Sequence, residues 1–543
     1  MNFDPKMAPQ EHVKQARDGL AVWDDIFRYA QSGFASISKD DFLRMRWFGI
    51  YQQRPNEGHF MWRIKIPGGR LRPHQLREIG RLAERCARGF GDITTRQDIQ
   101  LHWLRIEDFP DAIDAVYRRA GLYTQFACGD CPRNITSCPL DDLAADQVLL
   151  LGDLVQRVSD MYRDGGTEFS NLPRKFKPSI AACPLHCHLP QINCVSTFLA
   201  ARQSGGNREY GLGVMAGGGL SDKPHFAQSL RVFIPAADIP RAVPAVFRAV
   251  AHIFRDADQL RYKRGHARLK FLVAERGWQW FRDELEKRLG QPLAHDDTIV
   301  WPEGAVATDH MGIQRQRNGL YCVGVPVPCG RCTAAQMIAL ADLAERFAAA
   351  GDAEIRLSFR QNAFIANIPQ ENLPAMCDAL AAIGLPHDAS PWRQALIACT
   401  GRQFCNLAVV ETKDRARAIL DYLEKNAPID VPLMVSVTGC PNSCAQHHIA
   451  DIGLTGIPVV LPDKRKVDGF NVLVGGRLGA EPRFAREIAR KVPGDRVHHT
   501  IAALARFYMA NRRTGPDGRP ELFADFVART SDADLSEAAR TPA

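Results

Sequence analysis

The stretch of sequence that decides the fold, residues 58–103, reads GHFMWRIKIPGGRLRPHQLREIGRLAERCARGFGDITTRQDIQLHW. It recurs at residues 319–367, at an offset of about 261, as GLYCVGVPVPCGRCTAAQMIALADLAERFAAAGDAEIRLSFRQNAFIAN. In both copies a β-like run ends in Gly-Arg, a helix with apolar residues at helical spacing follows, and a strand-like segment begins at Arg-Gln. Ordered matches of several kinds indicate a duplication with a pseudo-two-fold body rather than a chance resemblance of α/β units. The corresponding helical residues are Leu76, Ile79, Leu82 and Ala83 in one copy and Met337, Leu340, Leu343 and Ala344 in the other.

The repeat extends into the segments that follow. CPLHC at 183–187 resembles CPNSC at 440–444, and MAGGGL at 215–220 resembles LVGGRLG at 473–479. We therefore predict a mixed α and β fold (α+β) in which each half has a smaller βαβ piece followed by a larger α/β piece. The expected domains are residues 1–120, 121–300, 301–385 and 386–513, with a linker at Pro302, Glu303 and Gly304 and a loosely packed tail at 514–543.

Composition narrows the function classes. The chain has 543 residues, of which 24% are charged and 45% hydrophobic, so we expect a globular protein of several domains. It has no recognisable nucleic-acid module, no apolar run of a membrane span and a polar amino terminus, which together predict a cytoplasmic protein. The net charge of +8 suits an acidic partner. In a reducing compartment, the clustered members of its 15 cysteines are expected to be metal ligands or redox groups.

Two cysteine pairs lie in segments rich in Gly, Pro, Thr and Asn. Cys399 and Cys405 form one pair, and Cys440 and Cys444 form the other. Two such loops brought together by folding present four thiolates, the ligand set of a four-iron cluster. A zinc site and buried cysteines without a ligand role are the alternatives that the spacing leaves open.

Five motifs resemble those of the siroheme- and [4Fe-4S]-dependent nitrite and sulfite reductases of the ferredoxin-dependent assimilatory type. They are ACTGRQFCNLA at 398–408, TGCPNSC at 438–444, TTRQDIQLHW at 94–103, CPRNITSCPL at 131–140 and NLPRKFK at 171–177. The resemblance extends from about Asp18 to the last helical segment. It implies siroheme and a [4Fe-4S] cluster, a ferredoxin-like piece and a siroheme-binding piece in each half, and six-electron reduction of sulfite to sulfide or nitrite to ammonia. Electrons would come from ferredoxin or a similar small carrier, and we expect a monomer.

The resemblance also assigns residues. Cys399, Cys405, Cys440 and Cys444 would hold the cluster, and Cys444 would also bridge to the siroheme iron. The cations at the substrate would be Arg96, Arg133, Lys175 and Lys177. The two lysines are two residues apart, so both point to one face of an extended segment. Lys177 favours sulfite, because several nitrite-type members carry Asn there.

Other cations are candidates for the siroheme carboxylates. They are Arg174, Arg402 and the basic run Arg261, Lys263, Arg264, Arg268 and Lys270, for which a solvated basic face is the alternative. His447 and His448, just beyond Cys444, are expected to be structural rather than ligands.

The first half has cysteines of its own. They indicate either a second metal centre or a remnant of the duplication, and the spacing of Cys128 and Cys131, which does not copy that of Cys399 and Cys405, favours the remnant. Where the family often has Ile-Asn-Asp, this chain has Ile-Asn-Cys at 192–194. The cysteines concerned are Cys128, Cys131, Cys138, Cys183, Cys187 and Cys194.

The remaining interpretations concern other functions. YGLGVMAGGGL at 210–220 lacks the spacing of a dinucleotide-binding loop, so we expect electrons to arrive on a separate carrier. The alternative functions are a siroheme-lineage enzyme of cobalamin biosynthesis and a non-catalytic cysteine-rich zinc protein.

Overall fold

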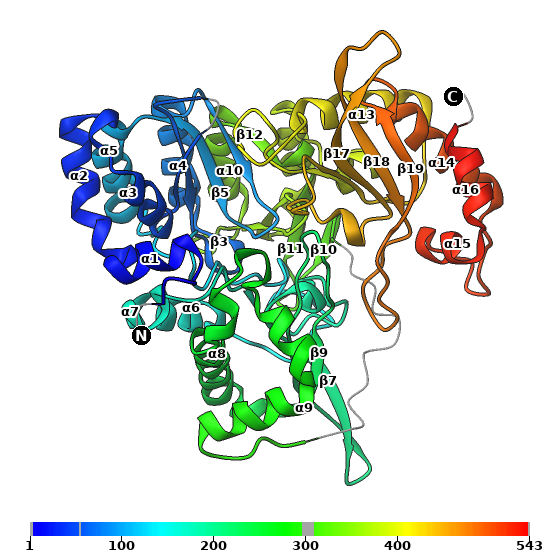
Figure 1. Ribbon diagram of the computed structural model, residues 1–543. Helices are drawn as coiled ribbons and strands as arrows, with labels where there is room; N and C mark the ends of the chain where they lie inside the picture. Colours follow the sequence, from blue (N-terminus) through cyan, green and yellow to red (C-terminus); the bar gives the residue numbers. More distant parts are fainter. Residues whose placement is uncertain (1–3, 54–55, 296–308, 541–543) are drawn as a thin grey trace.

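The computed structural model describes residues 4–53, 56–295 and 309–540 (Figure 1). The expected linker at Pro302, Glu303 and Gly304 lies outside the described residues. The described residues form four β-sheets, two built mainly from each half. Among the described residues, no helix combines the length and the apolar character needed to cross a bilayer.

Two five-stranded antiparallel sheets form the centre, and each takes one strand from the other half of the chain. Strand β12 of the second half pairs with β4 at Arg331 and Asp92, and β3 of the first half pairs with β13 at Arg70 and Arg356. Each half thus gives the equivalent short strand to the sheet of the other half, as expected for two copies of one duplicated unit. The first sheet has the order β1 (Ile50–Gln52), β2 (Phe60–Ile64), β5 (Ile99–Leu104), β4 (Phe90–Ile93) and β12 (Arg331–Thr333), and the second has the order β10 (Ile313–Arg315), β11 (Tyr321–Val325), β14 (Ala363–Ile368), β13 (Glu354–Leu357) and β3 (Arg70–Leu71).

Helices α4 (Pro73–Cys86) and α10 (Ala334–Phe347), the two copies of the repeated helix, pack against each other. Pro73 begins α4, and Thr333 caps α10 by accepting a hydrogen bond from the backbone of Gln336. A Cβ atom at Gly80 would lie 2.8 Å from Cγ1 of Ile338, so the close approach of the helices requires glycine there. Of the apolar residues matched in the sequence, all are buried except Leu343, which is partly buried.

The two Arg-Gln pairs of the repeat lock the halves together. Nε2 of Gln97 donates to the backbone oxygen of Leu357 at 2.7 Å, and Nε2 of Gln361 donates to that of Ile93 at 2.9 Å. Both glutamines have positive φ angles, 59° and 66°, which turn their side chains toward the opposite half. Equivalent residues therefore make equivalent bonds across the pseudo-two-fold axis.

The other two sheets are mixed and carry the larger piece of each half. Strands β6 and β7 run parallel, as do β15, β16 and β17, and the remaining pairs are antiparallel. After β8 the backbone N of Gly217 donates to the oxygen of Cys194, and after β18 that of Gly475 donates to Asp451. The glycine-rich stretch is thus a duplicated strand end. The strands are β6 (Pro178–Ser179), β7 (Val195–Ser204), β8 (Asn207–Ala216), β9 (Gln228–Pro235), β15 (Leu396–Ala398), β16 (Val435–Thr438), β17 (Ile452–Val460), β18 (Lys466–Val474) and β19 (Arg486–Pro493).

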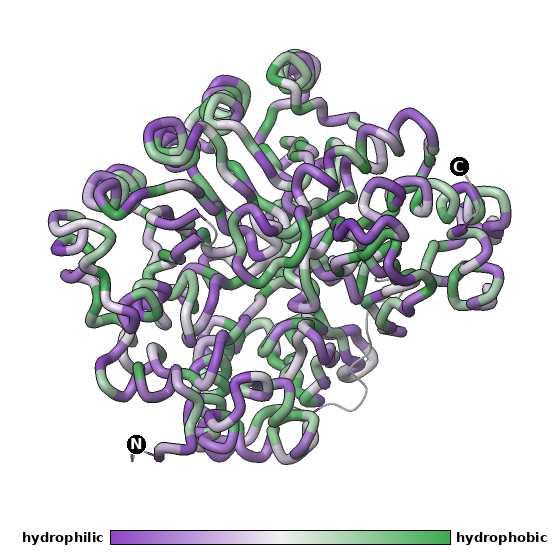
Figure 2. Tube along the Cα trace, turned by 45° about the horizontal axis from the view of Figure 1, so that its top comes forward, coloured by the Kyte–Doolittle hydropathy of each residue, from purple (hydrophilic) through white to green (hydrophobic). Residues whose placement is uncertain are grey.

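Helices surround the sheets, and in Figure 2 hydrophilic residues are frequent along the outer ones. The expectation of a loosely packed tail is wrong for residues 523–540. Two helices form there, and Phe523, Phe526 and Leu535 are buried in the core of the second half, which explains why the segment is ordered. The remaining α-helices are α1 (Pro9–Ala16), α2 (Trp23–Ser32), α3 (Lys39–Arg44), α5 (Phe109–Ile113), α6 (Leu154–Gly165), α7 (Thr167–Ser170), α8 (Ile239–Arg255), α9 (Leu269–Leu289), α11 (Leu373–Ala382), α12 (Pro391–Ala395), α13 (Lys413–Asn426), α14 (Val497–Asn511), α15 (Phe523–Arg529) and α16 (Asp532–Arg540).

Candidate active site

A cleft of about 730 Å³ lies where the two halves meet. Four of the predicted cations line it from the first half: Arg133, Arg174, Lys175 and Arg264. Asn406 and Leu407, which directly follow Cys405, line it from the second half. Folding therefore brings a cluster motif and the anion-binding motifs to one cleft.

Lys175 lines this cleft, and Lys177, two residues further along the same extended segment, lines a smaller cavity beside Cys444. Phe176, between them, is completely buried, so alternation along the backbone turns both lysines to the opposite face. The backbone N of Arg133 donates to the oxygen of Phe176 at 2.7 Å, and the N of Phe176 donates to Cys131 at 3.1 Å. This pairing of two segments places Arg133 beside the lysines.

The electrostatic neighbours of the lysines are mainly other cations. Burial, with Arg268 nearby, lowers the pKa of Lys175 to about 7. Burial, followed by Lys175 and Arg96, lowers the pKa of Lys177 well below its usual range. Buried cations that repel one another are stabilised by a bound anion, so the arrangement favours an anionic ligand.

The four predicted cluster cysteines lie on two loops of the second half. Cys399 follows β15, and its Sγ accepts a hydrogen bond from the backbone N of Gly439 at 3.2 Å. Burial raises the pKa of Cys399 to about 12, which favours the neutral thiol unless a metal binds. The backbone N of Cys405 donates to Gly401, closing the turn of the first loop. Cys440 is buried, whereas Cys444 is exposed.

Cys444 lies at the junction between the halves. Its backbone oxygen accepts a hydrogen bond from Oγ1 of Thr95 at 3.0 Å, so a first-half loop holds it. It lines a second, much smaller cavity of about 20 Å³ together with Lys177 and Arg96. Its thiolate favours the charged forms of both Lys175 and Lys177. The predicted bridging cysteine and the predicted substrate cations are thus neighbours.

Arg96 is held in place by hydrogen bonds to three segments of the first half. It donates to Oδ1 of Asn193 at 2.9 Å and to the backbone oxygen of Pro178 at 2.8 Å, and it also bonds the oxygen of Asn134. Burial lowers the pKa of Arg96 to about 10. These bonds use much of the guanidinium, so Arg96 joins three segments of the anion-binding wall.

The two arginines predicted for the siroheme carboxylates differ. Arg174 donates to the backbone oxygen of Arg264 at 2.9 Å and lines the cleft. Arg402 instead forms a two-pronged ion pair with Asp468 of β18, at 2.8 and 3.2 Å. The structure therefore places Arg174 at the cleft, whereas Arg402 is paired with a carboxylate of the second half, to which it belongs itself.

The predicted basic run does not form one solvated face. Arg261 is fully buried in an ion pair with Glu11 at 2.6 Å, and Lys270 is bound to backbone oxygens, including that of Leu220 at 2.9 Å. Arg264 lines the cleft but is paired with Asp130. In the same region Nε2 of His448 donates to the oxygen of Ser221 at 2.9 Å, a structural contact.

Arg63 is a cation that the motif comparison missed. Its Nη1 donates to Sγ of Cys128 at 2.8 Å and to the oxygen of Ala127 at 3.4 Å, and Nη1 of Arg133 donates to that same oxygen at 3.3 Å. The sequence contained a signal: Arg63 is the charged residue in the otherwise apolar run FMWRI at 60–64, and its counterpart in the repeat is Gly324.

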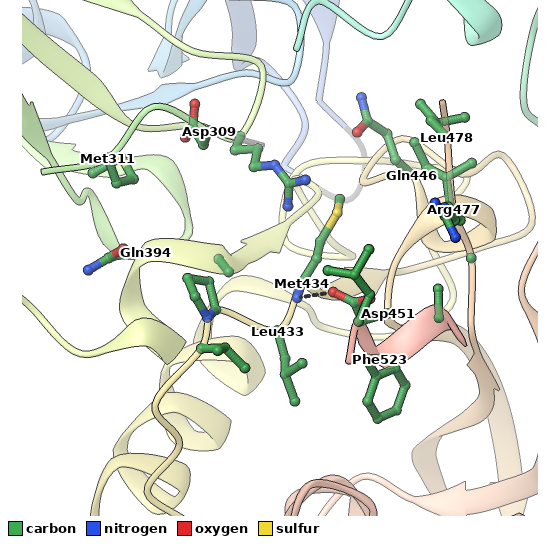
Figure 3. Close-up of a pocket in the computed structure, with 18 of the residues that line it drawn as sticks. Asp309, Met311, Gln394, Leu433, Met434, Gln446, Asp451, Arg477, Leu478 and Phe523 are labelled. Atoms are coloured by element: carbon green, nitrogen blue, oxygen red, sulfur yellow. Dashed lines mark hydrogen bonds between the residues drawn. The ribbon is translucent and has the colours of Figure 1, made fainter. Parts of the chain in front are cut away.

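A separate, largely apolar pocket of about 380 Å³ is shown in Figure 3. Met434, Leu433 and Phe523 contribute apolar surface, and the backbone N of Met434 donates to Asp451 at 2.8 Å. Among the described residues that line it there is none of the predicted cations or cluster cysteines.

Comparison with known proteins identifies the family to which the chain belongs. Residues 128–293 and 393–533 match the family model of the nitrite and sulphite reductase 4Fe-4S domain, and residues 51–118 and 313–383 match that of the nitrite/sulfite reductase ferredoxin-like half domain. The chain belongs to this family of oxidoreductases. Both models match twice, so the predicted duplication and the mixed α and β fold are confirmed.

Individual members of the family are similar over nearly their whole length. A sulfite reductase [ferredoxin] of Mycolicibacterium paratuberculosis is 36% identical, covering 98% of this chain and 97% of that protein. An assimilatory ferredoxin-dependent nitrite reductase of Haloferax mediterranei is 35% identical, covering 95% and 91%. The solved structure of the Mycobacterium tuberculosis NirA protein superposes with a TM-score of 0.88 at 35% identity, covering 97% of each chain.

The residues present fit the cofactors of this family, siroheme and a [4Fe-4S] cluster. Four cysteines on two loops of the second half could supply the thiolates that a four-iron cluster needs, and the backbone N of Gly439 donates a hydrogen bond to one of them, Cys399. The cleft beside them is lined by Arg133, Arg174 and Lys175, which suit the carboxylates of a tetrapyrrole. The predicted cofactors are thereby confirmed at the level of the family.

Proposed function

We propose that this enzyme reduces sulfite to sulfide, and nitrite to ammonia at the same site, by six electrons received singly from reduced ferredoxin or a similar small carrier. The observation that carries the proposal is the meeting of Arg133, Lys175 and Lys177 of the first half with Cys444 of the second. Relatives named for either anion support both substrates. Lys177, rather than the Asn of several nitrite-type members, favours sulfite.

The proposed roles divide between the halves. Cys399, Cys405, Cys440 and Cys444 would hold the cluster, and Cys444 would also ligate the siroheme. When bound, siroheme would supply a redox-active metal at which the anion is reduced with electrons from the cluster. Arg174 would contact siroheme carboxylates.

The cations of the first half would bind the anion, donate protons to it and stabilise its developing charge. Arg133 offers a rigid fork to two oxygens, whereas each lysine is a mobile point charge. Every oxygen that leaves as water needs two protons. The Nζ of Lys175, with a pKa of about 7, can donate a proton at neutral pH and then take up another from solvent. The same charges stabilise the negative charge that develops on the oxygens.

The proposal includes the organisation of the chain. We infer domain boundaries near residues 120, 300 and 385, a monomer, and a place in the cytoplasm with the carrier. The positive net charge favours association with an acidic ferredoxin.

Steady-state assays test the function. Protein purified with its cofactors is supplied with a chemically reduced dye, and then with reduced ferredoxin, and turnover of sulfite and nitrite is measured side by side. Sulfide and ammonia as products, from protein with a haem-type Soret band, are expected. Colourless protein that contains only zinc, or coloured protein inactive on both anions, would overturn the proposal in favour of one of the alternatives.

A further inference from the structure

A group of four metal-ligating side chains, three from the first half and one from the start of the second, lies apart from the cysteines assigned to the cluster. Cys138, Cys183, Cys187 and His310 each offer a ligand atom, and these atoms all lie within 4.8 Å of one another. The three thiols are at most 4% exposed and free of disulfide bonds. Among the described residues, no other group of three or more Cys, His, Asp or Glu side chains meets this spacing.

The pseudo-two-fold axis shows where this group comes from. Oε1 of Gln97 accepts a hydrogen bond from the backbone N of the residue before Cys138, at 2.8 Å. Oε1 of Gln361 accepts one from the residue before Cys399, at 2.9 Å. Cys138 and Cys399 are therefore equivalent positions. The prediction had compared Cys128 and Cys131 with Cys399 and Cys405, but Cys138 is the counterpart of Cys399.

Three of the four ligand positions are thus duplicated. CPLHC at 183–187 repeats CPNSC at 440–444, so Cys183 and Cys187 are the counterparts of Cys440 and Cys444. The fourth position has no cysteine in the first half. His310, from the segment that leads into β10, takes its place.

The distances distinguish a single ion from a second cluster. Nε2 of His310 is 3.4 Å from Sγ of Cys138 and 3.4 Å from Sγ of Cys183. A tetrahedral zinc with bonds of about 2.3 Å to sulfur and about 2.0 Å to nitrogen sets its N and S ligands about 3.6 Å apart. A cubane would spread its ligands further, because iron and sulfide atoms lie between them. The cysteines of the second half, which do not meet the 4.8 Å spacing, have the wider arrangement.

We propose that Cys138, Cys183, Cys187 and His310 bind one zinc ion in a tetrahedral Cys3His site, at the first-half position equivalent to the iron-sulfur cluster. The set is closed, with four protein ligands and none left open for substrate, so its role is structural. Zinc binding releases the protons of the thiols and involves no electron transfer. The ion joins the entry of the second half to two loops of the first, close to the core that contains Phe359 and Ile449.

Metal analysis of the intact, cofactor-loaded enzyme tests the site. We expect about one zinc per chain, beside the iron of one cluster and one siroheme, and a zinc X-ray absorption spectrum with three sulfur ligands and one nitrogen. Iron equivalent to a second cluster, with no zinc, would overturn the proposal. So would protein that lacks zinc as purified and takes up none when Zn²⁺ alone is added.

Variants separate the two metal centres. His310→Ala and Cys183→Ser should lose at least four-fifths of the zinc, and His310→Cys should keep it because four thiolates also bind zinc. Cys332→Ser, at a buried cysteine of β12 outside the group, is the matched control and should keep its zinc. If His310→Ala misfolds, two other results test the assignment. His310→Cys should retain zinc, and the X-ray absorption spectrum of the unaltered protein should show three sulfur ligands and one nitrogen. Zinc unchanged in folded His310→Ala would overturn the assignment.

This test does not depend on the reductase activity. Its readout is zinc content, whereas the proposed function is read from turnover and the Soret band. An enzyme that reduces neither anion but binds zinc at these residues would leave the metal site standing.

Discussion

Asp92 of β4 and Arg331 of β12 form a buried two-pronged ion pair across the junction between the halves, with N–O distances of 2.8 and 3.0 Å. The ammonium group of Lys413, on the helix after the first cluster loop, lies 3.8 Å from the same carboxylate. Burial raises the pKa of Asp92, but Lys413, His102 and Arg331 outweigh it and hold the pKa well below 3.8. One carboxylate therefore joins both halves beside the cysteine loops.

Asp92→Asn should destabilise the protein by about 3–5 kcal/mol at neutral pH, because two buried cations lose their partner. The pKa of Asp92 is lower in the folded than in the unfolded state. Its contribution is therefore fully present above the unfolded pKa of about 3.9 and is lost as the pH falls through the folded value. Urea denaturation should show a large difference at pH 7 that narrows below pH of about 4. Asp342→Asn, which breaks an ion pair whose carboxylate is 57% exposed, is the control and should cost about 1 kcal/mol at most.

A difference between the Asp92→Asn variant and the unaltered protein that stays constant from pH 7 to pH 3 would contradict this electrostatic role. It would indicate that packing, rather than charge, determines the cost of the substitution.

The fold and the site were predictable from the sequence to different degrees. The repeated helix and Arg-Gln pair predicted the duplication, because they recur in order at one spacing. The exchange of β3 and β12 between the sheets was not predictable, because two- and three-residue strands have no periodicity to detect. The pairing of Arg402 was not predictable for a similar reason: its partner Asp468 is distant in sequence, and only folding brings the two together.

Cys405→Ser should remove the [4Fe-4S] cluster, because a serine oxygen is a poor ligand in place of the thiolate. We expect the iron that is not in siroheme to fall by more than half and turnover to be lost with either anion. Iron and sulfide analysis beside the visible spectrum measures this. Cys377→Ser, at a half-buried cysteine of α11, is the control and should leave the iron content and the turnover unchanged. A full iron content in Cys405→Ser would remove this residue from the ligand set.

Lys177→Asn should shift the enzyme from sulfite toward nitrite. The lysine lines the cavity of Cys444, and loss of one positive charge weakens binding of the more highly charged anion more. The ratio of kcat/KM for sulfite to that for nitrite should fall roughly ten-fold or more, a differential effect of about 1.4 kcal/mol. Lys464→Asn, at an exposed turn, is the matched control. An unchanged ratio would show that Lys177 does not set the choice of anion.

Arg63→Met should lower kcat/KM for both anions by roughly a hundred-fold, the usual cost of removing one donor from a site that stabilises developing negative charge. Arg63 and Arg133 donate to the same backbone oxygen of Ala127, so their guanidinium groups are neighbours, and methionine keeps much of the length while removing the charge. Because Arg63 is on strand β2, outside the cysteine loops, cluster iron and the Soret band should be unchanged. Arg465→Met, where the side chain is 72% exposed, should keep full activity. If Arg63→Met instead loses siroheme while Arg465→Met does not, Arg63 binds the cofactor rather than the anion.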